Sequence, residues 1–352
     1  MAGISYTMNQ ERSRAVSRNY SLDILRLLSM IMVTVLHFWG WGGLKNLPFS
    51  DGRFLISTSI YTLSKGAVLI FWIISAWFTD DDIRLHYRVK KLKKLYIKVW
   101  LYSVSLFFIS IFCFDDKFNI IQLVKSIFPI LSRQYWFITQ YFLFYLITPY
   151  LKKLVLHLTN GELIALISII KLYPILTGET CILDCLSTAL IVFGIQRLWS
   201  GIDKYKAFGF GIMFVIFMLC SECVDFLTFK YSELNISRVL AIQDNFSLLG
   251  AISLFIFFIK INSKSKFSKI LGKNFSGSVV AIYLITVHPT LKVHIYHYIY
   301  THIPDNLLYF CGFFVFFTVV ISFICIVLDW GISVLINKLS ALLKNCIKRK
   351  NL

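Results

Sequence analysis

The sequence predicts an all-α protein, a polytopic integral membrane bundle of about ten transmembrane helices with both termini in the cytoplasm. The first observation is composition: of the 352 residues, 57% are hydrophobic and 17% aromatic, and the mean hydropathy is +0.72. Soluble domains do not usually reach this level. The second is a series of long apolar segments, and the third is the uneven placement of lysine and arginine between them. Lipid is therefore expected to surround most of the chain.

Ten apolar segments are candidates for crossing a bilayer, which takes about 17 to 25 residues. They are residues 22–41, 57–78, 96–114, 136–151, 162–176, 181–199, 207–228, 241–259, 277–299 and 307–335. The fourth and fifth are short, with Pro149 and Pro174 near their ends. These two are expected to be tilted, kinked or only partly spanning.

A single membrane domain is expected, because the chain has only 6 prolines, 17 glycines and no long polar stretch. Residues 1–20 are predicted to be a cytoplasmic N-terminal tail, 21–337 the membrane domain and 338–352 a basic cytoplasmic tail. The polar first tail and the long apolar segment after it predict no cleavable signal peptide. The stretch KLSALLKNCIKRK either lies on the anionic inner leaflet or is a solvated tail that fixes topology.

The net charge of +18 fits this topology. With the N-terminus in the cytoplasm, most lysines and arginines fall in the inner loops and ends, as the positive-inside rule requires. The rule explains the charge without a nucleic acid, so the expected partner is the bilayer and no nucleic acid is predicted. The chain is therefore interpreted as a multi-pass protein of a cell membrane.

Cysteine and histidine spacing predicts no metal site. The eight cysteines match no disulfide or metal framework, and even Cys220 and Cys223 are interpreted as small buried residues. His294, His297 and His302 lack metal-site spacing and are interpreted as interfacial. No bound cofactor is predicted either.

Three ionisable side chains interrupt the first apolar segment, SLDILRLLSMIMVTVLH: Asp23, Arg26 and His37. Such a residue costs roughly 2.5 to 3.5 kcal/mol at the bilayer centre, so it normally faces the bundle interior and has a function. Arg26 and His37 are about three turns apart, which puts them on nearly the same face at roughly 16 Å. Asp23 can pair with Arg26. The alternative is an interfacial ion pair, with His37 in an aromatic belt.

The segment from Arg18 to His37, with Leu22-Asp23-x-Leu25-Arg26 and then Arg26-x(10)-His37, resembles the opening motif of the acyltransferase-3 family of membrane enzymes. Four later segments are similar to motifs of that family, in the expected order. They are AVLIFWIISAWF (67–78), RVKKLKKLY (88–96), YWFITQYFLFYLITPYL (135–151) and GSVVAIYLITVHP (277–289). The five matches cover most of residues 18–290.

The chain departs from the family pattern in three places. Ala67 and Ala76 stand where glycines are usual, and two extra residues precede His288. Lys91 and Lys94 occupy the positions expected for paired arginines. Lysine attracts phosphate as a point charge but cannot form the bidentate fork of arginine.

The resemblance implies transfer of an acyl group, acetyl by family habit, from cytoplasmic acyl-CoA to a hydroxyl group. The implied acceptor is a surface or extracellular polysaccharide or its lipid-linked precursor, and the implied location a bacterial plasma membrane. His37 is expected to act as general base or as acyl carrier, with Arg26 orienting the donor and Asp23 orienting Arg26. His288, beside Pro289, is a further catalytic candidate, with a structural role as the alternative. Acetyl-CoA enters as co-substrate, and the resemblance implies no particular oligomeric state.

Two more sets of residues are assigned from the same motifs. The donor is a polyanion, so cytoplasmic cations are expected to bind it; these are Arg88, Lys91 and Lys94. The acceptor path is assigned to Ser75, Trp136 and Tyr145. Topology-setting charges and ordinary helix packing are the alternative explanations for the two sets.

A second class of function is kept open. A transporter or flippase for lipid-linked glycans, or a glycan polymerase, would also be polytopic, aromatic-rich and dotted with buried charges. Asp184 and Glu222 would then be candidates for a proton relay. This class predicts independence from acyl-CoA.

Overall fold

The computed structural model describes residues 18–80, 82–178, 184–231, 236–263, 265–275 and 277–350, and no strand occurs in these ranges. The all-α fold class is thus confirmed. In chain order the helices are α2 Tyr20–Trp41, η1 Leu44–Asn46, α3 Gly52–Ser64, α4 Gly66–Trp77, α5 Leu85–Phe114, α6 Ile120–Ile127, α7 Trp136–His157, α8 Asn160–Thr177, α9 Asp184–Arg197, α10 Trp199–Ile202, α11 Ala207–Lys230, α12 Ile236–Ile261, α13 Lys266–Phe275, α14 Val279–Thr286, α15 Leu291–Thr301 and α16 Leu307–Lys350.

Within the described ranges, seven helical segments are long and apolar enough to cross a membrane. They are Tyr20–Trp41, Gly52–Trp77, Leu85–Phe114, Asn160–Thr177, Ala207–Thr228, Ser237–Ile261 and Leu307–Val334. Each overlaps one of the predicted spans, so a multi-pass membrane protein is confirmed. The count of ten and the side on which each terminus lies remain predictions.

The other three predicted spans take different forms. The fourth is α7, a longer helix than expected, whose hydropathy is lowered by polar side chains. The sixth is the shorter α9, preceded by residues 179–183 that lie outside the described part. The ninth is broken into α14 and α15, which meet at 81°. Pro289 lies in this break, where it has no N–H to continue a helix.

The second predicted span also contains a break. It begins at Gly52 rather than at residue 57, and Lys65 separates α3 from α4. The backbone of Lys65 stays near helical values, at φ −58° and ψ −31°, so the two helices together still form one crossing segment. The break therefore sets a charged side chain at the middle of a span.

Local capping explains where α2 and α8 begin. The side chain of Asn19 accepts hydrogen bonds from the N–H groups of Ser21 and Leu22, so α2 starts at Tyr20. Thr159 and Glu162 form a reciprocal capping box at the start of α8. Residues 1–17 of the predicted N-terminal tail lie outside the described part.

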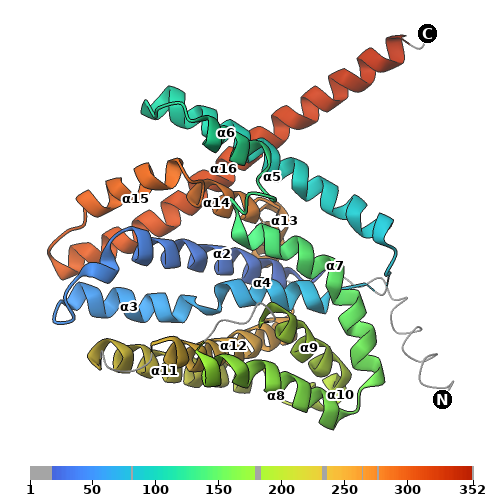
Figure 1. Ribbon diagram of the computed structural model, residues 1–352, viewed down its shortest axis with the longest axis vertical. Helices are drawn as coiled ribbons and strands as arrows, with labels where there is room; N and C mark the ends of the chain where they lie inside the picture. Colours follow the sequence, from blue (N-terminus) through green and yellow to red (C-terminus); the bar gives the residue numbers. More distant parts are fainter. Residues whose placement is uncertain are drawn as a thin grey trace.

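Figure 1 shows α2 and the α3–α4 pair running side by side through the molecule, with α11 and α12 packed along one flank. The helix α16 crosses the bundle beside α14, α2 and α3 and continues away from it as far as Lys350. The predicted boundary at residue 337 thus falls inside one continuous helix. The largest hydrophobic core joins α2, α4, α9, α12 and α14.

An ion pair between a partly exposed lysine and a buried carboxylate joins α5 to α16 and gives a test of the packing. Lys98 Nζ lies 2.7 Å from Asp329 Oδ1, which also accepts a hydrogen bond of 2.7 Å from the Tyr102 hydroxyl. Lys98→Met should destabilise the protein by roughly 3 kcal/mol, because a buried carboxylate is left without its cation. The measurement is thermal unfolding in lipid nanodiscs.

Adding Asp329→Asn to Lys98→Met should restore most of the lost stability, because the uncompensated charge is gone. Lys93→Met, at an exposed position of the same helix, is the control and should change little. Equal melting temperatures for Lys98→Met and Lys93→Met would contradict a stabilising role of the pair.

Candidate functional site

Asp23 is held between two arginines at the start of α2. Its side chain is 4% exposed. Oδ2 accepts a 2.6 Å hydrogen bond from Arg18 Nε, and Oδ1 accepts one of 2.9 Å from Arg26 Nη1. Arg18 Nη2 also donates to the carbonyl of Gly272, at 3.0 Å. The expected Asp23 pair with Arg26 is present, and Arg18 makes it a three-residue cluster.

Helix α13 packs directly against this cluster at Gly272, where there is no side chain between the two helices. A Cβ atom at Gly272 would come within 3.0 Å of the Asp23 Cβ and 3.1 Å of the Tyr20 ring. The loop before α13 is tied to the same place, since Ser263 N–H donates to Ser21 Oγ at 2.7 Å. The contact of α13 with α2 thus fixes the geometry around Asp23.

His37 lies at the other end of α2, on the same face as Arg26 by helix periodicity. Its ring stacks on Trp41, with centroids 4.5 Å apart and planes at 9°. Lys292 Nζ lies 4.5 Å from the centroid of the Trp41 ring. His37 Nδ1 is buried and has no hydrogen-bond partner among the described residues. This nitrogen is thus a polar atom enclosed by the protein whose hydrogen-bonding capacity is unused among the described residues.

A cavity of about 400 Å³ lies beside this stack. Its walls come from the end of α2 and from α15, with Trp41, Lys292 and Tyr296 among the lining residues. A volume in the range of about 300 to 1,000 Å³ is typical of small-ligand sites. The C-terminal end of α2 therefore adjoins a cavity of small-ligand size.

Around Arg26 the structure brings together several residues from the predicted donor and acceptor sets. The Arg26 guanidinium lies 5.9 Å from the Phe78 ring centroid, and its side chain is 35% exposed. Tyr141 lies within electrostatic reach of both Arg26 and Arg88, and its hydroxyl lies near the Ser75 side chain. Tyr145 stacks on Tyr141, with centroids 6.2 Å apart. Ser75 and Tyr145 are thus part of one wall, joined through Tyr141.

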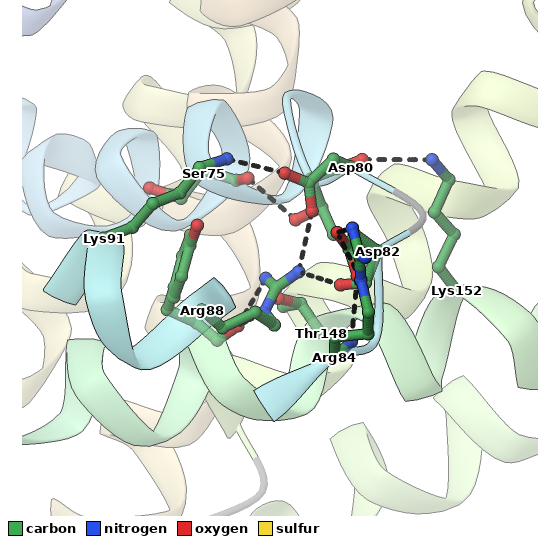
Figure 2. A network of polar contacts seen from close by, with 10 residues as sticks. Ser75, Asp80, Asp82, Arg84, Arg88, Lys91, Thr148 and Lys152 are labelled. Carbon is green, nitrogen blue, oxygen red and sulfur yellow. Dashed lines mark hydrogen bonds and ion pairs between the residues drawn. The ribbon is translucent and has the colours of Figure 1, made fainter. Parts of the chain in front are cut away.

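Arg88 is the centre of the network in Figure 2. Its Nη1 donates to Asp80 Oδ1 at 2.8 Å and to the carbonyl of Asp82 at 3.0 Å. Lys91 Nζ donates to the other Asp80 oxygen at 2.7 Å. On α7, Arg88 Nε and Nη2 donate to the carbonyl of Tyr145 at 3.0 and 2.6 Å, and its guanidinium lies over the Tyr145 ring at 4.2 Å.

The Tyr145 carbonyl accepts these bonds because of Pro149. In a regular helix this oxygen would accept from the N–H of residue 149, and proline has none. Pro149 lies inside α7, so the carbonyl is left for another donor. Arg88 supplies two, which ties α5 to α7 where the helix lacks its own bond. The sequence motifs identified Arg88, Tyr145 and Pro149 separately, but they did not predict the contact between Arg88 and the Tyr145 carbonyl.

The side chains of the predicted donor-binding residues differ in their solvent exposure. Arg88 is 1% exposed and its guanidinium is already bound on two sides. Lys91 is 44% exposed while paired with Asp80, and Lys94 is exposed. In the loop between α4 and α5, hydrogen bonds from Arg84 lower the pKa of the Asp82 carboxyl group to about 2. The geometry makes Arg88 a positioning residue and leaves the lysines accessible.

Trp136 is not brought to this wall. It lies in the first turn of α7 with 43% of its surface exposed, and its ring packs edge-on against Phe137. Nine residues of helix, roughly 13 Å, separate it from Tyr145. The neighbouring Phe137 ring in turn packs against Tyr141, with centroids 6.3 Å apart, and the acceptor path through Trp136 and Tyr145 stays a prediction.

His288 is buried at the bend between α14 and α15. Its Nε2 lies 3.1 Å from the carbonyl of Ser103, and its Nδ1 lies 2.9 Å from Thr290 Oγ1. A carbonyl only accepts, so Nε2 carries the proton and Nδ1 accepts from the threonine. Both nitrogens are engaged within the protein, which favours a structural role at the bend over proton transfer.

Two of the residues that sequence reasoning missed carry a signal in the sequence. Asp80 and Arg18 are charges next to a predicted span, and each has a residue of opposite charge within five positions, Arg84 and Asp23 respectively. Tyr141 and Lys292 carried no such signal, because their partners come from distant helices. Of the two acids assigned to the alternative function, Glu222 accepts a hydrogen bond from Ser59, and the side chain of Asp184 lies outside the described part. Among the described residues, no group of three or more metal-binding side chains lies together.

Fold and site together define a multi-pass helical membrane protein with a charged cluster and an aromatic-lined cavity at opposite ends of one helix. The sequence profile of the family described as "Acyltransferase domain" matches residues 19–327. The chain therefore belongs to the acyltransferase-3 family, and membership supports a general acyltransferase role. No curated protein and no solved structure matches in the corresponding comparisons.

The Arg88 connection gives a second prediction. Arg88→Lys should destabilise the protein, because lysine cannot form the forked contact with the Tyr145 carbonyl. In a Pro149→Ala background the carbonyl regains a helical partner, so the same substitution should cost about 1 to 2 kcal/mol less. The four proteins form a thermal-unfolding cycle in nanodiscs, and equal losses in both backgrounds would show that Pro149 does not create the role of Arg88.

Proposed function

We propose that this protein transfers an acyl group, acetyl in the simplest case, from cytoplasmic acyl-CoA to a hydroxyl group of a surface polysaccharide or of its lipid-linked precursor. The proposed location is a bacterial plasma membrane, with both ends of the chain in the cytoplasm. The observation that carries the proposal is the arrangement of α2, with the Asp23 cluster at one end and His37, beside a cavity, at the other.

The donor end is supported by charge and access. Asp23 orients Arg26 by a 2.9 Å ion pair, and the guanidinium remains partly exposed. The exposed Lys91 and Lys94 add positive charge on α5. Acyl-CoA carries phosphates, and arginine binds them through charge-assisted hydrogen bonds. In this proposal Arg26 orients the donor while Arg88 holds α5 and α7 in place around it.

The transfer itself is assigned to His37. In direct transfer, the imidazole takes the proton of the acceptor hydroxyl as its oxygen attacks the thioester carbonyl. The carbon–sulfur bond then breaks, and the CoA thiolate leaves and takes up a proton. In the carrier route, His37 attacks the thioester first, and the carbon–sulfur bond breaks as the CoA thiolate leaves with a proton. The acceptor hydroxyl then attacks the acyl-imidazole, and its proton goes to the imidazole as that leaves. A buried Nδ1 without an internal partner fits either route.

His37→Ala tests this assignment. Acyl transfer should fall by about 10² to 10⁴, the usual contribution of a positioned proton acceptor, while the melting temperature changes little. CoA release and acylated product are measured with purified protein in nanodiscs. His302→Ala is the matched control, because His302 is exposed at the end of α15. Near-normal turnover by His37→Ala would remove this residue from the mechanism.

Arg26 and Asp23 give a separate kinetic prediction. Arg26→Ala should raise the KM for acyl-CoA at least tenfold, because a charge-assisted contact to the donor is worth about 1.5 to 3 kcal/mol. Asp23→Asn should raise it less, since Arg26 keeps its charge and loses only its orientation. A change in kcat alone, with KM for acyl-CoA unaltered, would contradict a donor-orienting role.

Family membership favours acyl transfer over the transporter or polymerase alternative. The two classes separate on one measurement, the release of CoA by the intact protein with and without a glycan acceptor. Acceptor-dependent CoA release supports the proposal. Glycan movement or polymerisation without any binding of a CoA thioester would support the alternative.

A further inference from the structure

A second polar cavity lies in the spanning part of the molecule and is not used in the proposed mechanism. It has a volume of about 460 Å³ and lies between α2, η1, α3 and α12. Its walls include Trp39, Tyr61, Lys45, Lys65 and Asp244; we call it the Trp39 pocket. Trp39 is two residues after His37 on α2, which turns it to the opposite side of the helix.

An aromatic wall of fixed geometry lines the Trp39 pocket. The rings of Trp39 and Tyr61 stack with centroids 4.0 Å apart and planes at 20°. Trp39 Nε1 donates a 3.2 Å hydrogen bond to Thr58 Oγ1, which holds the indole in place. A rigid aromatic surface with polar groups beside it offers a flat apolar face and directional partners at the same time.

Of the two lysines that line this pocket, Lys65 is held by buried partners. Lys65 Nζ lies 3.1 Å from Asp225 Oδ1 and hydrogen-bonds to Gln243. Thr62 donates to the other oxygen of Asp225, which is 3% exposed. The Asp225 carboxylate is the counter-ion that offsets the cost of burying this lysine within a spanning segment. Lys65 presents a positioned donor to the pocket rather than a mobile charge.

Asp244 has a different environment. It lies in the span Ser237–Ile261, yet its side chain is exposed, and the space next to it is the Trp39 pocket. It is also within electrostatic reach of Lys65 and Tyr61. An ionised side chain exposed on a spanning helix is costly against lipid and normally faces a substrate path. The pocket therefore suits a polar ligand with an apolar face.

We propose that the Trp39 pocket binds a sugar ring. The C–H face of the sugar packs on the Trp39–Tyr61 stack, its hydroxyls donate to Asp244, and Lys65 and Lys45 donate to its oxygens. Naming this sugar as part of the glycan acceptor rests on the proposed function. The pocket then holds the glycan on one side of α2 while the reacting hydroxyl meets His37 on the other.

Saccharide binding in the absence of acyl-CoA tests this proposal. The protein is purified without glycoside detergents and placed in nanodiscs, because such detergents carry a competing sugar. Saturation-transfer NMR is recorded with the methyl glycosides of glucose, galactose, mannose and N-acetylglucosamine. A second arm places a glycosylated lipid in the nanodisc, which separates a soluble glycan from a lipid-linked one. We expect saturation of the ring C–H protons of at least one probe.

Asp244→Asn and Trp39→Leu should each reduce that signal at least tenfold. Asp244→Asn keeps the size of the side chain at an exposed position, so loss of folding does not explain its effect. Trp100→Leu, a partly exposed tryptophan of α5, is the control and should bind as the unchanged protein does. No binding of any probe, or binding that both pocket variants retain, overturns the proposal.

The same measurements separate this inference from the proposed function. His37→Ala should keep saccharide binding while losing acyl transfer. Binding that depends on Trp39 and Asp244 in a protein without acyl transfer would leave the pocket in place and remove the acyltransferase proposal. Acyl transfer that persists in a protein with no saccharide binding would support the acyltransferase proposal and remove the sugar-binding role of the Trp39 pocket.

Discussion

A bilayer offers no hydrogen-bond partner, so each polar group in a spanning segment must find one within the protein or in a cavity. The Tyr145 carbonyl shows how strongly this constraint shapes the fold. Pro149 removes its helical partner, and Arg88 replaces it from another helix while also binding Asp80. The result joins α5, α7 and the end of α4 in one arrangement, and the wall formed by Tyr141 and Ser75 depends on that arrangement.

The same constraint explains why charges gather at the places where helices are interrupted. Lys65 lies at the break between α3 and α4, and its counter-ion comes from α11. His288 lies at the bend between α14 and α15, with both ring nitrogens bound. An interruption frees backbone groups and opens space, and neighbouring helices fill that space with polar side chains. Such positions are candidates for ligand sites only where a cavity remains.

Helix α2 connects the features of functional interest. Asp23 and Arg26 occupy its first turns, and His37 and Trp41 its last. Because side chains two positions apart point to opposite sides of a helix, Trp39 lines one cavity, while His37 stacks on Trp41, which lines the other. A single rigid helix thus sets the distance between the Asp23 cluster and His37, which a loop could not do with the same accuracy.

The sequence by itself determined the helical membrane class, seven of the spans, the family and the periodic alignment of Arg26 with His37, because composition and helix period are local properties. It also identified Arg88, Tyr145 and Pro149 separately. Only the tertiary structure decided that Arg88 is enclosed, and that Lys65, Asp225 and Asp244 gather near Trp39. Those outcomes depend on which distant helix supplies each partner, and no local pattern in the chain encodes that choice.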